Sequence, residues 1–258
     1  MTKATGKTDG EAFTDITVLL DRSGSMAAMR DDAIGGFNAF IAEQKKLPGS
    51  ALITLVQFDD RYEVVYAGRD IREVPDLTRE TFVPRGGTLL RDSLVRTLSE
   101  TLARVSERRV PVLGEDKLVK AEHPVLFVVI TDGADTGSAT TGEAVKRAVD
   151  EAKGRGWEVL LIGANIDAIS LGASLGAKGL NYQQGNMKQA MGAASAYVGT
   201  SRLAHSPDAG IRARASVLRS HVMSARSVES HEMHESVASY ADLIAAVETA
   251  VKVETTEE

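Results

Sequence analysis

Short runs of apolar residues recur along the first two thirds of the chain, with little polar alternation inside them. The runs cover residues 16–20, 52–58, 125–130 and 159–162. Each is rich in Val, Ile and Leu and shorter than an ordinary helix, which is typical of strands buried on both faces of a sheet. The pattern therefore predicts four buried strands.

Segments with a helical period separate these runs. Apolar residues three and four apart predict helices within 26–41, 94–105 and 144–152. Thr140 and Glu143 form a capping-box pattern at the start of the third helix. A short strand around Leu180 and a helix that starts near Asn186 complete the pattern.

Alternation of strands and helices predicts an α/β fold with a doubly wound, open and mostly parallel sheet that has helices on both faces. The strand-like runs 52–58 and 62–67 are the exception, because only a few polar residues separate them. Such spacing predicts a hairpin. We therefore expect one antiparallel strand at the edge of the sheet.

The character of the chain changes near residue 201, where Arg, Ser and His replace the apolar runs. We divide the chain into a flexible N-terminus, 1–12, a domain, 13–200, and a helical or partly disordered C-terminal appendage, 201–258. A weak apolar stripe within 243–251 could dock on the domain, pair with another copy of the chain, or bind a partner's helix. The polar connection 107–123 is expected to be an exposed loop.

Composition narrows the chemistry that this fold can carry. The 258 residues are 43% hydrophobic and 26% charged, enough for one substantial core. The chain has no cysteine, so a metal must be held by oxygen or histidine. A net charge of -6 argues against a general attraction to nucleic acid or to an anionic membrane. With no apolar run that could serve as a signal peptide or a membrane span, we expect a cytoplasmic protein.

Oxygen-bearing side chains follow two of the predicted strands and precede one of the predicted helices. Open α/β sheets form their sites at the carboxyl ends of strands, so we expect these side chains to converge. Two carboxylates and three hydroxyls suit a hard cation, Mg²⁺ or alternatively Mn²⁺ or Ca²⁺. The candidate metal ligands are Asp21, Ser23, Ser25, Thr88 and Asp132.

These positions match a known motif. Asp21-x-Ser23-x-Ser25, Thr88 after a Gly-Gly turn, and Asp132 in Thr-Asp-Gly resemble the metal-ion-dependent adhesion site of the von Willebrand factor type A domain family, over about residues 13–200. The resemblance implies the sheet order 3-2-1-4-5-6, with the metal between the first strand and the strand at 125–130.

The resemblance also implies roles for the individual residues. It implies that Ser23, Ser25 and Thr88 coordinate the metal, with Thr88 engaging when a ligand binds. Asp21 and Asp132 then act through water. Without a signal sequence, the chain looks like the intracellular prokaryotic or phage members of the family, which serve as adaptors in larger assemblies, sometimes with an ATPase partner.

Ligand chemistry suggests a function for such a site. Hydroxyls and water neutralise a cation poorly, so a carboxylate from a partner protein is a favoured last ligand. We therefore expect a metal-dependent protein-binding module and no catalysis. Ser25 and its neighbours could instead only cap a helix. A phosphoryl-transfer hydrolase with an aspartyl nucleophile would need a second acid where Ser23 stands. A third alternative is an assembly protein that self-associates through its appendage.

Other polar residues are assigned no site. Asp59, Asp60 and Asp135 lie near strand ends and are expected to be solvated loop carboxylates. His231 and His234 are three apart, a spacing that can bind a metal on a helix, but no third ligand accompanies them. The arginines of the appendage lack interleaved aromatic residues, so we do not expect nucleic-acid binding.

Overall fold

A six-stranded sheet of order β3-β2-β1-β6-β7-β8 forms the centre of the protein. The computed structural model describes residues 13–107, 109–111, 118–120, 123–164, 167–183, 186–206, 208–225 and 231–254. The strands of the sheet are β1 (Phe13–Asp21), β2 (Ser50–Phe58), β3 (Tyr62–Asp70), β6 (Val125–Thr131), β7 (Glu158–Gly163) and β8 (Lys178–Asn181). Strand β3 pairs antiparallel with β2, and the other pairings are parallel. The predicted sheet, its order and its antiparallel edge are confirmed.

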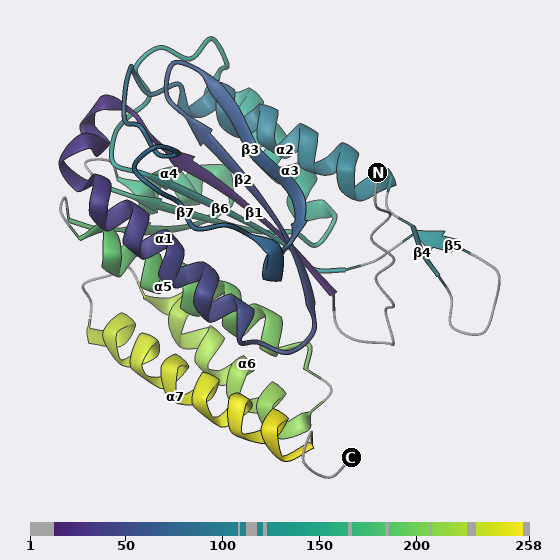
Figure 1. The fold of residues 1–258 in the computed structure, drawn as a ribbon. Coiled ribbons are helices and arrows are strands. Elements are labelled where there is room, and N and C mark those ends of the chain that lie inside the picture. Colours follow the sequence, from purple (N-terminus) through teal and green to yellow (C-terminus); the bar gives the residue numbers. More distant parts are fainter. Residues whose placement is uncertain are drawn as a thin grey trace.

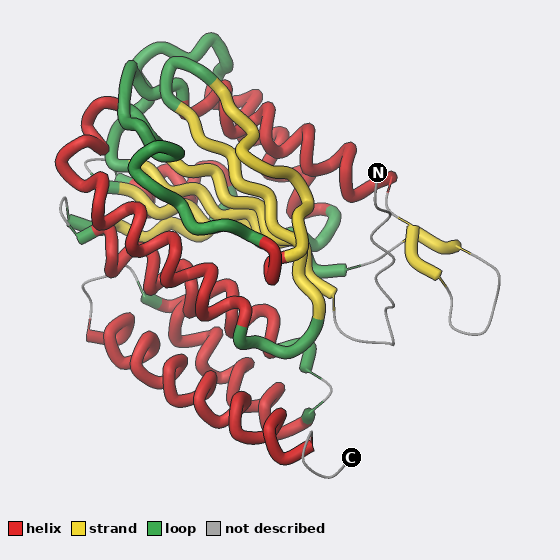
Figure 2. Tube along the Cα trace, in the orientation of Figure 1, coloured by secondary structure: helices red, strands yellow, loops and turns green. Residues whose placement is uncertain are grey.

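Helices cover both faces of this sheet (Figure 1, Figure 2). The helices of the domain are α1 (Arg30–Lys45), α2 (Leu90–Glu107), α3 (Gly142–Gly154), α4 (Ala168–Leu175) and α5 (Met187–Leu203). Helices α1 and α5 cover one face, while α2, α3 and α4 cover the other. Side chains alternate between these faces because the strand period is two. Val18 and Leu20 pack under α1 and α5, whereas Leu19 packs on the opposite side.

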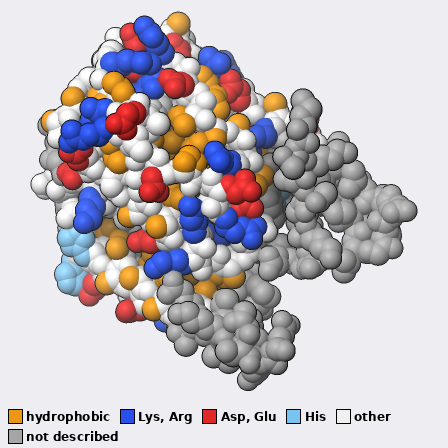
Figure 3. Space-filling model, in the orientation of Figure 1, with side chains coloured by type: hydrophobic (Ala, Val, Ile, Leu, Met, Phe, Trp, Pro, Cys, Tyr) orange, Lys and Arg blue, Asp and Glu red, His pale blue; other side chains and the backbone are white. Residues whose placement is uncertain are grey.

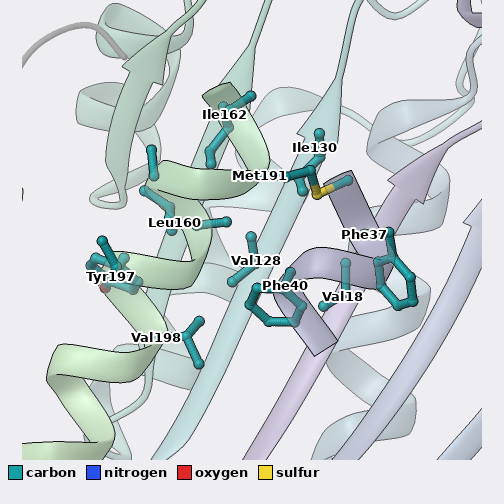
Figure 4. Packing of buried hydrophobic residues seen from close by; sticks show 14 of the residues in the cluster. Val18, Phe37, Phe40, Val128, Ile130, Leu160, Ile162, Met191, Tyr197 and Val198 are labelled. Carbon is teal, nitrogen blue, oxygen red and sulfur yellow. The ribbon is translucent and has the colours of Figure 1, made fainter. Parts of the chain in front are cut away.

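The core under α1 and α5 is built from large apolar side chains in close contact (Figure 4). Val128 and Leu160 come from the central strands, and Phe40 and Val198 reach them from the two helices. Gly36 allows the helices to approach closely, since a Cβ built there would lie 2.8 Å from Cγ of Met191. This packing fixes α1, which is joined to the end of β1 through the 3₁₀ helix Gly24–Met29.

The C-terminal part of the chain packs back on the domain. Helices α6 (Ala209–Ser224) and α7 (His231–Glu254) lie along α5, and the boundary expected at residue 200 falls inside α5. Tyr240, Leu243 and Val247 are buried, so part of the apolar stripe contacts the domain. The side chain of Val251 lies outside the described residues.

Buried polar contacts also join α1, α5 and α7. Arg202 donates from Nη1 to the backbone oxygen of Gln44 at 2.7 Å, and Gln44 donates from Nε2 to the Tyr240 hydroxyl at 3.1 Å. Burial lowers the pKa of Arg202 to about 10. The bonds satisfy groups that would otherwise be buried without partners. They tie α7 and the end of α5 to α1.

Several finer expectations are corrected or lie outside the described residues. The N-cap of α3 is Thr141, whose side chain accepts from the Ala144 amide at 3.2 Å, and not Thr140 as expected. The described part of the connection 107–123 contains the antiparallel strands β4 (Arg109–Pro111) and β5 (Leu118–Lys120). The N-terminus, 1–12, lies outside the described residues. Within the described ranges, none of the helices combines the length and apolarity needed to cross a membrane.

Candidate metal centre

Asp21 ends β1 and is fully buried. Its Oδ2 accepts a 2.6 Å hydrogen bond from Thr131 at the end of β6, and its Oδ1 accepts a 2.7 Å bond from the Ser23 amide. Burial raises the pKa of Asp21 to about 6, the nearby charge of Asp132 acts in the same direction, and the two hydrogen bonds oppose the rise. The carboxylate is thus held rigidly between two strands.

Ser25 connects the segment after β1 to the segment after β6. Its Oγ donates to Oδ1 of Asp132 at 2.8 Å and lies 3.1 Å from Oγ of Ser23. Asp132 is fully buried, and burial raises the pKa of its carboxyl above the usual range. Ser25 is exposed, while Ser23 is buried. The cluster therefore meets solvent on the side of Ser25.

Thr88 comes from a third segment, just before α2. Its amide donates to Oγ1 of Thr136 at 2.9 Å, and the Thr136 amide donates to the Thr88 oxygen at 2.9 Å. A Cβ built on Gly133 would lie 3.7 Å from Oγ1 of Thr88 and 3.9 Å from Oγ of Ser25. Both hydroxyls therefore border the same small space beside Gly133. The structure brings all five candidate ligands to the carboxyl edge between β1 and β6.

The chemistry of this cluster fits a hard divalent cation. The donors are two carboxylates and three hydroxyls, all of them oxygen, which is the ligand type that Mg²⁺, Mn²⁺ and Ca²⁺ prefer. Burial raises the pKa of Asp21 and of Asp132, and a nearby positive charge would reverse both shifts. The absence of a side chain at Gly133 leaves the space between the hydroxyls open. The residues present therefore suit such an ion.

Helix capping does not account for the cluster. Ser23 is the residue before the 3₁₀ helix Gly24–Met29, but its side chain makes no capping hydrogen bond to that helix. Its hydroxyl lies against Ser25, and the Asp21 carboxylate is bonded to Thr131. The bond between Asp21 and Thr131 runs between segments, and Ser23 does not cap the helix, so a local helix cap does not account for the motif.

Sequence reasoning missed two residues near the cluster. Asp59 is fully buried and pairs with Arg22 at 3.0 Å, so its assignment as a solvated carboxylate is wrong, whereas Asp60 is exposed as expected. Tyr182, just after β8, is buried as well. Burial and the charges of the two site carboxylates raise its pKa. A charged residue inside the motif, Arg22, was the one sequence signal that a buried acidic partner was required.

The other polar candidates have structural roles or no site. Asp135 accepts a hydrogen bond from the Arg91 amide at 2.9 Å. Burial opposes its ionisation, but bonds from Arg91 and Ser138 outweigh this and hold the pKa of Asp135 below its usual range. His231 lies 3.5 Å from exposed Glu235. Across the described residues, no three or more His, Asp or Glu side chains are grouped to hold a metal, so the candidate centre depends on its hydroxyls.

Comparisons with known proteins return structural likeness alone. No protein-family model matches the chain, and no curated protein matches its sequence. Among solved structures, VWA2 of Sulfolobus acidocaldarius, a paralog of ArnB, aligns with a TM-score of 0.48 at 15% identity over 72% of this chain and 45% of its own. The von Willebrand factor domain of the pilus tip protein Mfa5 of Porphyromonas gingivalis aligns with a TM-score of 0.47 at 12% identity, over 73% of this chain and 95% of its own.

A third structure is the manganese-loaded TRAP protein of Plasmodium vivax, with a TM-score of 0.40 at 17% identity over 58% of this chain and 57% of its own. The chain thus spans about half the length of the archaeal and Plasmodium proteins. At these TM-scores and identities, the likeness carries no conclusion about function.

Proposed function

We propose that this chain is a protein-binding module of the von Willebrand factor type A kind, and that its binding depends on a divalent metal. One observation carries the proposal. Ser25 bonds to Asp132 across 107 residues of sequence, and the Thr88 hydroxyl borders the same space from a third segment. Capping, packing or turn formation does not require three segments to present oxygen atoms to one point.

The hydroxyl and carboxylate residues of the cluster have different roles in holding the ion. Ser23, Ser25 and Thr88 offer neutral hydroxyl oxygens, and Asp21 and Asp132 supply the negative charge, directly or through water. We favour Mg²⁺, with Mn²⁺ and Ca²⁺ as alternatives, because the donor set is all oxygen and rich in hydroxyls. When bound, the ion supplies positive charge and a coordination position for an oxygen ligand from outside.

The exposure of the cluster gives the direction from which a partner approaches. Asp21 and Asp132 are buried behind the serines, while Ser25 lies at the surface. A side chain arriving at Ser25 meets hydroxyls that neutralise a cation poorly, so a carboxylate is favoured there over a neutral group. The partner in this proposal is therefore a protein that presents an Asp or Glu.

Binding, and not catalysis, is the role that these residues support. The position two residues after Asp21 holds Ser23, whose hydroxyl contacts Ser25, where an aspartyl-phosphate enzyme needs an acid. We extend the proposal to a cytoplasmic adaptor within a larger assembly, with an ATPase among the candidate partners. That extension rests on analogy with the family that the sequence resembles.

The test uses Mn²⁺ and short peptides. Mn²⁺ is bound to the metal-free chain, and the relaxation of water protons is followed while a peptide with one Glu is added. A matched peptide with Gln in its place is the control. We expect the Glu peptide to lower the relaxation as its carboxylate displaces bound water, and the Gln peptide to leave it unchanged. Equal effects of the two peptides, or no Mn²⁺ binding, would overturn the proposal.

A further inference from the structure

A buried cluster of charged groups lies directly beside the candidate metal centre. Arg22, between Asp21 and Ser23 in the motif, is buried. Its Nε donates to Oδ2 of Asp59 at 3.0 Å, its Nη1 donates to Gln57 at 3.2 Å, and its Nη2 lies 2.8 Å from a carboxylate oxygen of Glu63. Gln57 belongs to β2, Glu63 belongs to β3, and Asp59 lies in the turn between these strands. The cluster therefore ties the metal-binding motif to the edge of the sheet.

A second arginine reaches the same carboxylate oxygen. Arg85 donates from Nε to Oδ2 of Asp59 at 2.9 Å. Arg85 belongs to residues 85–89, the segment that carries Thr88 and is called the Thr88 loop below. One oxygen atom of Asp59 thus accepts from Arg22 of the motif and from Arg85 of the Thr88 loop. These two segments supply all three hydroxyls of the candidate centre.

Backbone hydrogen bonds run beside this shared carboxylate. They join Arg85 N to Arg22 O at 2.9 Å, Gly24 N to Gly86 O at 3.1 Å, and Leu89 N to Asp59 O at 3.0 Å. Gly86 has a φ of +63°, and a Cβ there would come within 2.5 Å of Oδ1 of Asp60. The Thr88 loop is therefore held on both sides of Thr88 and follows a path that only glycine allows at its turn.

The charge balance keeps Asp59 ionised. Burial alone would raise the pKa of Asp59, but the hydrogen bond from the Arg61 amide and the charges of Arg22 and Arg85 outweigh it, so the pKa lies below its usual range. Removing one partner from a buried ion pair leaves the other charge without compensation, which is strongly unfavourable. The three side chains therefore act as one unit.

We propose that Asp59, with Arg22 and Arg85, is a positioning group that fixes the Thr88 hydroxyl relative to the serine hydroxyls of the metal centre. The inference deepens the proposed function and rests on it. Asp59 does not touch the metal and acts through the two arginines. Groups that orient metal ligands in this way typically alter metal affinity by about 10–100-fold when they are mutated.

The test compares two buried carboxylates, Asp59 beside the metal centre and Asp15 near the start of β1. Asp59→Asn removes the shared acceptor charge beside the centre. Asp15→Asn removes a fully buried carboxylate that pairs with Arg104 at the far end of the strand. Both variants are expected to lower stability. We expect only Asp59→Asn to weaken Mn²⁺ binding, by about tenfold, and to speed hydrogen exchange at the Gly24 and Leu89 amides.

A second variant covers failure of Asp59→Asn to fold. Arg85 is 39% exposed in its side chain, and Arg85→Gln removes one bond to Asp59. We expect the same two effects, each smaller. Unchanged Mn²⁺ affinity together with unchanged exchange at Leu89 in the folded variants would overturn the inference.

Failure of the inference is separable from failure of the proposed function. If the unaltered chain binds no Mn²⁺, the proposed function fails, and with it the role assigned to Asp59, whatever the exchange rates show. If the unaltered chain binds Mn²⁺ and Asp59→Asn binds it equally well, with slow exchange retained at Gly24 and Leu89, only the positioning role is wrong. Asp15→Asn is the control that shows whether a general loss of stability is enough to weaken Mn²⁺ binding.

Discussion

Ser25 donates a hydrogen bond from Oγ to Oδ1 of Asp132 at 2.8 Å, although 107 residues separate them. The bond crosses from the segment after β1 to the segment after β6, the neighbouring parallel strand. It thereby links the two segments that carry four of the five candidate ligands. The bond also gives the fully buried Asp132 carboxylate a hydrogen-bond donor, which contributes to stability. In the proposed function, the exposed position of Ser25 gives its hydroxyl a role in binding the ion.

Removing this hydroxyl tests that role. Ser25→Ala is expected to lower the free energy of unfolding by about 1–2 kcal/mol, because the buried Asp132 carboxylate loses a hydrogen-bond donor. Mn²⁺ affinity is expected to fall by about tenfold or more, since a ligand and the hydrogen bond to Asp132 are lost together. Ser174→Ala removes an exposed hydroxyl bonded to the Leu171 oxygen and serves as the control. Equal Mn²⁺ affinity in both variants would contradict the assignment.

Asp21 is expected to weaken the metal-free fold when it is ionised. Its folded pKa of about 6 lies above the ordinary 3.8, so the destabilisation is complete above pH 6, shrinks as the pH falls, and is absent below about pH 4. Asp21→Asn removes the charge and is expected to raise the free energy of unfolding at pH 8 in EDTA by about 1–2 kcal/mol. Urea unfolding of both chains at pH 8 and at pH 4 measures this difference.

Asp21→Asn also distinguishes a binding role of Asp21 from a structural role. A residue that serves binding can be replaced with a gain in stability and a loss of metal binding. The same Asp21→Asn chain is expected to lose Mn²⁺ binding, because the Asn side chain carries no negative charge. An equal loss of stability at pH 8 and pH 4 would show that the carboxylate serves the fold and not an ion.

Gly133 tests the space between the hydroxyls. A Cβ there would make ordinary contacts of 3.7 Å with Thr88 and 3.9 Å with Ser25, so Gly133→Ala is expected to fold normally. The added methyl group borders the proposed ion position and is expected to weaken Mn²⁺ binding severalfold. Gly137→Ala in the same loop adds a methyl 3.7 Å from a Leu89 carbon and is the matched control. Calorimetric titration of both variants makes the comparison, and identical affinities would count against the site.

The C-terminal helices are expected to contribute to stability. Leu243 is 1% exposed, and Leu243→Ala is expected to cost about 2–4 kcal/mol through lost packing. Val217, on α6, is 59% exposed, and Val217→Ala is expected to change stability by less than about 0.5 kcal/mol. Urea unfolding of both variants distinguishes a docked helix from a loose appendage. A negligible effect of Leu243→Ala would show that α7 does not pack as described.

Much of the sheet was predictable because its strands are buried on both faces and read as continuous apolar runs. The hairpin was predictable from the short polar spacing between residues 52–58 and 62–67. The convergence of Asp21, Ser25 and Asp132 was predictable because parallel strands end at one edge of the sheet. The packing of α7 on the domain was not predictable. Weak apolar stripes such as that around Leu243 occur equally in helices that bind partner proteins. The surfaces of α5 and α6, against which α7 packs, decide between these outcomes.

The burial of Asp59 could not be predicted from its neighbours in the sequence. Asp59 and Asp60 are adjacent and of one residue type, yet the first is fully buried and the second exposed. The difference arises from Arg22 and Arg85, which lie 37 and 26 residues away in the sequence. Pairing over such distances depends on the register of β1 and β2, which the apolar pattern alone does not specify.

Surface charge gives no competing account of binding on the face that Figure 3 shows. There, the described Lys and Arg side chains are interspersed with Asp and Glu, and no broad surface of one sign forms among them. An acidic partner would therefore find little general attraction on this face. In the proposed function, affinity for such a partner comes from the bound ion.

Metal binding at the five oxygen ligands is the central claim, and one calorimetric titration tests it most directly. Mn²⁺ is titrated into EDTA-stripped chain and into the Asp132→Ala variant, after urea unfolding has shown that both are folded. We expect one ion per chain in the unaltered protein and no measurable binding in the variant. Absence of binding in the unaltered chain, or equal binding in both, would contradict the account.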